Sequence, residues 1–151
     1  MQSFEFQVAV EAPLSTIFSL YSNLEWWRSR SIFSDVRWVQ GEPWEEGSRM
    51  RLESRTPVKA TVDHVILEFN RGESAVYLSH VLGITCETRV KFIARSTTHT
   101  TIQVQMQLLG TVSRMLGFAL EPVIEKSTRS FFEDLRRDSE AEARRAAASG
   151  D

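Results

Sequence analysis

Apolar and polar residues alternate through several stretches of the chain, and this alternation predicts β-strands. From Phe4 to Val10 every second residue is apolar, and the residues between are mostly polar. A repeat of two places successive side chains on opposite faces, as in a strand with one buried face. The pattern is clearest in the last two of the six later segments that we predict as strands: 36–39, 49–53, 58–69, 75–81, 84–92 and 102–108.

Two short helices are predicted directly after the first strand. Ala12-Pro13 closes that strand, and proline is well suited to the start of a helix. From Leu14 to Tyr21 the apolar residues recur at intervals of three and four, which gives one buried stripe. Ser22-Asn23 interrupts this pattern, and residues 24–27 predict a second short helical turn.

A long helix is predicted at the C-terminal end. From residue 112 to 135 the apolar residues are again spaced by three or four, and the chain then becomes charged and rich in alanine. Pro122 lacks the amide hydrogen that would bond to Phe118, so we expect a kink or a break there. Residues 147–151 are expected to fray as a C-terminal tail.

These elements predict an α+β helix-grip fold. A sheet with one apolar face needs a cover, and only the C-terminal helix is long enough to supply it. We therefore expect a curved antiparallel sheet of about seven strands wrapped around that helix, with the two short helices after the first strand. Residues 1–146 form one domain in this prediction. The long strand 58–69 is patterned less regularly, so we expect a bulge near Asp63-His64.

Composition agrees with one globular domain and narrows the function classes. The chain has 151 residues, 42% hydrophobic and 25% charged, and its net charge is -2. These values argue against a disordered chain, and the lack of basic excess argues against a nucleic-acid partner. Arginines and tryptophans interleave between Trp26 and Arg55, but acidic neighbours cancel much of their charge.

Targeting and membrane signals are not apparent in the sequence. No apolar stretch follows a basic N-terminal segment, and no run approaches the ~18 apolar residues of a spanning helix. Cys86 is the single cysteine and has no internal disulfide partner. We expect a cytoplasmic monomer or homodimer that does not insert stably into membranes.

The order of elements, the Ala12-Pro13 junction and the Trp26-Trp27 pair resemble the START-like (Bet v 1-like, SRPBCC) superfamily. Within it, the chain is most similar to the bacterial polyketide cyclase/dehydrase and coenzyme Q-binding group. The resemblance covers nearly the whole chain. It implies a hydrophobic cavity between the sheet and the long helix, with its mouth near the second short helix. This fold serves carriers, cyclases, stress proteins and regulators, so it does not by itself assign an activity.

The inward-facing positions predict a binding cavity. They are almost entirely apolar and contain no carboxylate pair, histidine cluster or Ser/His/Asp set, which suits an apolar ligand site better than acid–base catalysis. We expect a small hydrophobic or aromatic ligand, such as a lipid, an isoprenoid or a polyketide-like ring, and no cofactor. Trp27 and Phe33 are assigned to the gate. The predicted ligand-binding residues are Trp27, Phe33, Met50, Leu52, Cys86, Thr88, Val90, Met106, Leu108, Leu116, Leu120 and Ile124.

The main alternative is an enzyme, a polyketide cyclase/aromatase or dehydratase acting on a poly-carbonyl substrate. Its candidate proton-transfer groups are His64, His80 and Tyr77, whose facing the pattern leaves open. At least one of them has to face the cavity. The histidines and the cysteine have no metal-ligand spacing, so no metal site is predicted. A third hypothesis is a partner-binding module that presents the loops around Trp44.

Overall fold

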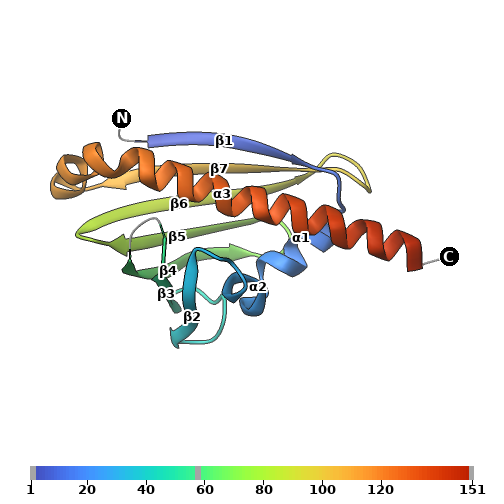
Figure 1. Cartoon of the computed structure of the whole chain (residues 1–151), viewed down its shortest axis with the longest axis horizontal. Coiled ribbons are helices and arrows are strands. Elements are labelled where there is room, and N and C mark those ends of the chain that lie inside the picture. The colour runs from blue at the N-terminus through green and yellow to red at the C-terminus, as the bar shows by residue number, and fades with distance from the viewer. Residues whose placement is uncertain (1–2, 57–58, 150–151) are drawn as a thin grey trace.

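The computed structural model has the predicted order of elements (Figure 1). It describes residues 3–56 and 59–149, with side chains described at all of these positions except 111–119. The elements are β1 (Ser3–Val10), α1 (Leu14–Tyr21), α2 (Leu24–Arg28), β2 (Phe33–Gln40), β3 (Arg49–Ser54), β4 (Ala60–Asn70), β5 (Ser74–Val81), β6 (Ile84–Ala94), β7 (Thr100–Leu109) and α3 (Thr111–Ser149). The predicted α+β helix-grip fold is confirmed.

The seven strands form one curved antiparallel sheet in the order β1-β7-β6-β5-β4-β3-β2 (Figure 1). Strands β2 to β7 follow one another as a meander, and β1 returns to pair with β7. Alternation places one face of each clear strand inward: Ile84, Cys86, Thr88, Val90 and Phe92 of β6 are all buried. The concave face of the sheet therefore holds the core.

The predicted bulge in β4 lies at a different position. Asp63 and His64 pair in regular register with both β3 and β5. The register with β5 shifts instead between Ile66 and Glu68, so Leu67 is the extra residue. The expectation of a bulge near Asp63-His64 was wrong, because ladder hydrogen bonds on both sides hold those two residues.

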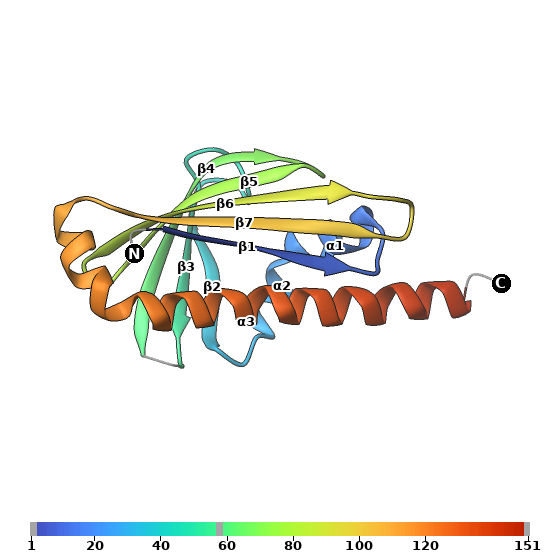
Figure 2. The same ribbon diagram turned by 90° about the horizontal axis from the view of Figure 1, so that it is seen from above.

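Helix α3 is continuous from Thr111 to Ser149 and contains Pro122. Its first turns run at an angle to the rest (Figure 2), which fits the loss of a backbone hydrogen bond at a proline. The helix persists past residue 146, where fraying was expected, and ends at Ser149. Its main contacts are with α1, β1, β6 and β7. The concave face on β3 to β5 therefore has less direct helix cover.

The aromatic residues gather in one cluster between the sheet and the helices. The ring of Tyr21 lies within 6.3 Å of the rings of Trp27, Trp44 and Phe132. Trp44 is only 6% exposed, and its indole Nε1 donates a hydrogen bond to the Ser22 carbonyl at 2.9 Å. Trp44 is a core residue. The hypothesis of a partner-binding surface around it needs an exposed aromatic side chain, and Trp44 does not provide one.

A buried arginine ties α2 to α3. Arg30, 9% exposed, lies 2.9 Å from Asp138 and 3.3 Å from Asp134, both on α3. The Trp26 indole donates to the same Asp138 carboxylate at 2.9 Å, and the guanidinium stacks 4.3 Å from the Trp26 ring. Because a guanidinium is planar and always charged, this arrangement fixes both the distance and the angle between the helices.

Replacing Arg30 with methionine is expected to lower the free energy of unfolding by about 2–3 kcal/mol, because two carboxylates lose a buried partner. The matched control is Arg137→Met. Arg137 pairs with the same two aspartates but is 63% exposed, so its loss is expected to cost less than about 1 kcal/mol. Chemical denaturation measures both, and equal losses would contradict the role given to Arg30.

Candidate functional site

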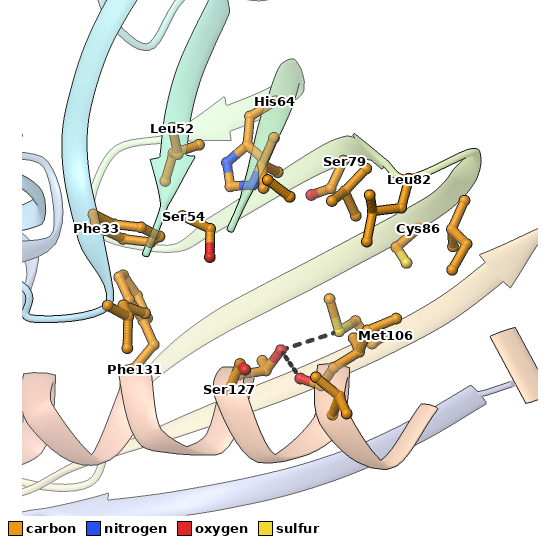
Figure 3. Close-up of a pocket in the computed structure, with 18 of the residues that line it drawn as sticks. Phe33, Leu52, Ser54, His64, Ser79, Leu82, Cys86, Met106, Ser127 and Phe131 are labelled. Atoms are coloured by element: carbon orange, nitrogen blue, oxygen red, sulfur yellow. Dashed lines mark hydrogen bonds between the residues drawn. The ribbon is translucent and has the colours of Figure 1, made fainter. Parts of the chain in front are cut away.

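A cavity of about 190 Å³ lies between the sheet and α3 (Figure 3). Its floor comes from β3 to β7, its roof from α3, and one side from Trp27 with the segment that leads into β2. It exceeds the apolar cavities of about 150 Å³ that bind benzene. None of the described side chains that line it is charged at neutral pH, and most are apolar.

Seven of the predicted ligand-binding residues lie in this wall: Trp27, Phe33, Leu52, Cys86, Met106, Leu120 and Ile124. They come from α2, four strands and α3, so only the folded chain brings them together. Trp27 and Phe33 lie at the side of the cavity near α2, where the gate was expected.

Four predicted residues lie outside the described wall. Met50, Thr88 and Val90 are fully buried in the core, and Leu108 packs in a small cluster with Ile84 and Cys86. Their inward facing was predicted correctly, but they occupy stretches of the strands where side chains close the space. The Leu116 side chain lies outside the described residues.

The three candidate proton-transfer groups separate. His64 and Tyr77 line the cavity, with their rings stacked at 4.6 Å between centroids. His80 points away from it, is exposed, and has its Nδ1 3.0 Å from the Thr85 hydroxyl. The alternation of β5 explains this, because Tyr77 and Ser79 face inward and His80 falls between inward positions.

Several lining residues were not predicted as site residues. Val62, Ser79, Ser127 and Phe131 all line the cavity. Ser79 pairs directly with His64 across β4 and β5. Paired residues share one face of the sheet, so knowing which way His64 faces would also have placed Ser79 in the cavity. Ser127 lies in the apolar stripe of α3 at a spacing of three and four from its neighbours, and that signal was available in the sequence.

His64 is neutral at physiological pH because of where it lies. Burial lowers its pKa from the usual 6.5 to about 3; the Asp63 carboxylate opposes this shift and His80 adds to it. Part of its surface is accessible, but that surface faces the cavity. The Trp27 ring lies edge-on at 6.1 Å. The imidazole is thus held between two aromatic rings in its uncharged form.

Tyr77 and Cys86 are also uncharged. Burial raises the pKa of Tyr77 to about 12, and nearby Tyr21 and Thr88 hydroxyls oppose that rise. Those two hydroxyls are buried near Tyr77 but do not reach hydrogen-bond geometry with any described group. Burial raises the pKa of the Cys86 thiol to about 11, so it is a poor nucleophile.

An exposed leucine stands at the rim. Leu82 lines the cavity, is 53% exposed and has φ 51°, in the left-handed region that a bulky residue rarely adopts. It is followed by Gly83 with φ 78°, and two such residues form the tight turn that suits a two-residue hairpin between β5 and β6. The turn therefore holds an apolar side chain at the cavity opening.

The sequence matches no family model and no curated protein. The structure, in contrast, aligns with many solved ones. The Zhui aromatase/cyclase from Streptomyces sp. R1128 aligns with a TM-score of 0.75 and 13% identity over 99% of this chain and 97% of that one. Norcoclaurine synthase from Thalictrum flavum, in complex with dopamine and hydroxybenzaldehyde, aligns with a TM-score of 0.71 and 10% identity over 93% and 87%. A START superfamily protein from Mycobacterium smegmatis aligns with a TM-score of 0.68 and 14% identity over 96% and 99%.

The chain has the START-like, Bet v 1-like fold. At these identities the alignments establish the architecture of the chain, and its own residues have to supply the argument for function. Within the described residues, no group of three or more His, Cys, Asp and Glu side chains could hold a metal ion. No helix in the described part of the chain is both long and apolar enough to cross a membrane.

The low pKa of His64 predicts a pH dependence of stability. Below about pH 6.5 the unfolded chain binds a proton at this imidazole and the folded chain does not, so stability is fully present above pH 6.5 and is lost toward pH 3. Between pH 7.5 and 5, wild type is expected to lose about 2 kcal/mol more free energy of unfolding than His64→Phe. Denaturant titrations at both values measure this.

The control for this pH experiment is His80→Gln. This variant keeps the buried His64 imidazole and loses only the smallest of the contributions to its low pKa, so it should retain most of the wild-type pH dependence. A His64→Phe protein that lost as much stability as wild type between the two pH values would contradict the assignment.

Proposed function

We propose that this protein binds a small, neutral, hydrophobic or aromatic molecule in the cavity between the sheet and α3. The observation that carries the proposal is the absence of charge in the described wall: it has no Asp, Glu, Lys or Arg, and His64, Tyr77 and Cys86 are uncharged at pH 7. An ion entering such a site would lose its hydration without gaining a partner, at a cost of several kcal/mol.

The size of the cavity favours a molecule with one or two rings. Apolar burial contributes about 25 cal/mol per Å² before the cost of ordering the ligand. The wall includes the aromatic side chains of Trp27, Phe33 and Phe131, which suit a flat molecule. The norcoclaurine synthase that shares this fold holds dopamine and hydroxybenzaldehyde, which supports small aromatic molecules as ligands of this architecture.

A cyclase or aromatase activity is the second candidate. It is favoured by the presence of both His64 and Tyr77 in the wall. The fold that the chain shares with the Zhui aromatase/cyclase also supports it. General acid–base catalysis works best when the pKa of the group lies near the working pH. Here the pKa values are about 3 and about 12, so ligand binding is the better supported function. Conversion of a poly-carbonyl compound by wild type and not by His64→Phe would reverse this order.

Binding is tested with p-xylene, a neutral ring that is no larger than the cavity. Calorimetric titration is expected to give a submillimolar dissociation constant for wild type. The anion p-toluate, of similar shape, should bind at least about tenfold more weakly, because the wall offers it no counter-charge. Mass spectrometry of what co-purifies with the protein provides the natural candidates.

Two variants fill the cavity from opposite walls, Val62→Trp on β4 and Val123→Trp on α3. Both are expected to weaken p-xylene binding at least about tenfold, since the added ring occupies the ligand's place. Val39→Trp is the matched control, because Val39 is exposed and lies outside the described wall. If wild type did not bind p-xylene, or if all three variants bound it equally, the proposed function would be wrong.

A further inference from the structure

Three side chains with polar atoms form one row across the cavity floor. His64 on β4 pairs with Ser79 on β5, and Ser79 pairs with Cys86 on β6. Residues directly opposite each other on antiparallel strands point to the same face, and all three line the cavity (Figure 3). Most of the other floor residues are apolar, and the remaining polar ones, Ser54, Thr56 and Tyr77, lie outside this row.

The ring nitrogens of His64 are available to hydrogen-bond a ligand. Its ring is held by stacking on Tyr77 and by the edge-on Trp27, and no described residue hydrogen-bonds to its nitrogens. Trp27 is itself fixed, because its indole donates to the Tyr21 carbonyl at 2.7 Å. A neutral imidazole has one donor and one acceptor. The orientation of both is therefore set by aromatic packing before any ligand arrives.

Ser79 supplies the second polar atom. Its side chain is only 5% exposed, lines the cavity, and makes no hydrogen bond with a described residue. Buried hydroxyls nearly always have a partner, and a hydroxyl can donate or accept. Cys86, the third member of the row, has a thiol that is only a weak donor. His64 and Ser79 thus place two adjacent hydrogen-bonding side chains on the floor.

The opposite wall offers less. On α3, the Thr128 hydroxyl donates to the Ile124 carbonyl at 2.8 Å, so its proton is already used. Ser127 provides one hydroxyl there, next to the Thr128 hydroxyl whose proton is already used. This asymmetry predicts which side of the cavity receives the polar end of a ligand.

We propose that His64 and Ser79 together bind one neutral oxygen of the ligand, a phenolic hydroxyl or a ring carbonyl, while its flat apolar body lies against the aromatic wall. This rests on the proposed function and names its ligand class: uncharged aromatic alcohols and ketones. The imidazole donates to a carbonyl or accepts from a phenol, and the serine hydroxyl takes the complementary part.

The test compares p-cresol with p-xylene, two molecules of the same shape that differ by a hydroxyl in place of a methyl group. Calorimetry gives both dissociation constants, and their ratio, p-xylene over p-cresol, measures the preference for the oxygen. In Ser79→Ala and in His64→Phe the ratio is expected to fall about tenfold, the value of one buried hydrogen bond. Binding of p-xylene itself should change less than about threefold.

Two control variants sharpen the result. His64→Gln keeps a donor and an acceptor and should retain most of the preference. Ser127→Ala removes a hydroxyl from the opposite wall and should leave the ratio unchanged. Ser79→Ala deletes a single atom, so it keeps the test decisive if His64→Phe does not fold.

The outcomes separate the two proposals. If p-xylene binds and the ratio is unchanged in both Ser79→Ala and His64→Phe, the oxygen site is wrong while the proposed function stands. A ratio that falls in Ser127→Ala instead would move the oxygen to α3 and also overturn the proposal. If neither molecule binds wild type, the proposed function itself fails.

Discussion

One helix has to cover the concave face of a seven-stranded sheet, and most of the structure follows from how it does so. The C-terminal half of α3 buries Phe131, Phe132 and Leu135 against α1 and the aromatic cluster. Its main strand contacts are with β1, β6 and β7. A single helix cannot fill a curved sheet from edge to edge at the density of a protein core. The space left over β3 to β7 is the cavity.

The position of the helix depends on a contact outside that cavity. Arg30, just after α2 ends, reaches to Asp134 and Asp138, which are separated from it by about a hundred residues of chain. Trp26 and Trp27 are neighbours on α2 but have different surroundings. The Trp26 indole donates a hydrogen bond to Asp138, while Trp27 lines the cavity. An ion pair therefore sets the place of an aromatic wall that carries no charge itself.

The ionisable side chains that line the cavity are all uncharged at pH 7, and burial is the reason in each case. Removal from water penalises the charged form of every ionisable side chain that faces it, whether acid or base. This lowers the pKa of His64 and raises those of Tyr77 and Cys86. Such a site discriminates by shape and by hydrogen bonds to uncharged atoms, and it offers little to a reaction that needs a ready proton donor or acceptor at pH 7.

Much of the fold was predictable from local patterns, because alternation and helical spacing are properties of neighbouring residues. The order of elements, the two short helices and the inward face of β6 all came from such patterns. The β4 bulge was predicted at the wrong position. A bulge is an extra residue relative to the partner strand, and the sequence of β4 alone does not show which residues of β5 it pairs with. Arg30 and its aspartates were missed because contacts between distant residues leave no local signal.

The candidate site, like the fold, was predictable where local pattern sets it and not where distant contacts do. The sequence alone determined that Met50 and Leu52 both point inward, since residues two apart on a strand share a face. Only the tertiary structure decided that Leu52 lines the cavity while Met50 lies in closed core. It likewise turned His64 inward and His80 outward. The facing of a side chain is set by the strand it belongs to, but the space in front of it is set by where a distant helix comes to rest.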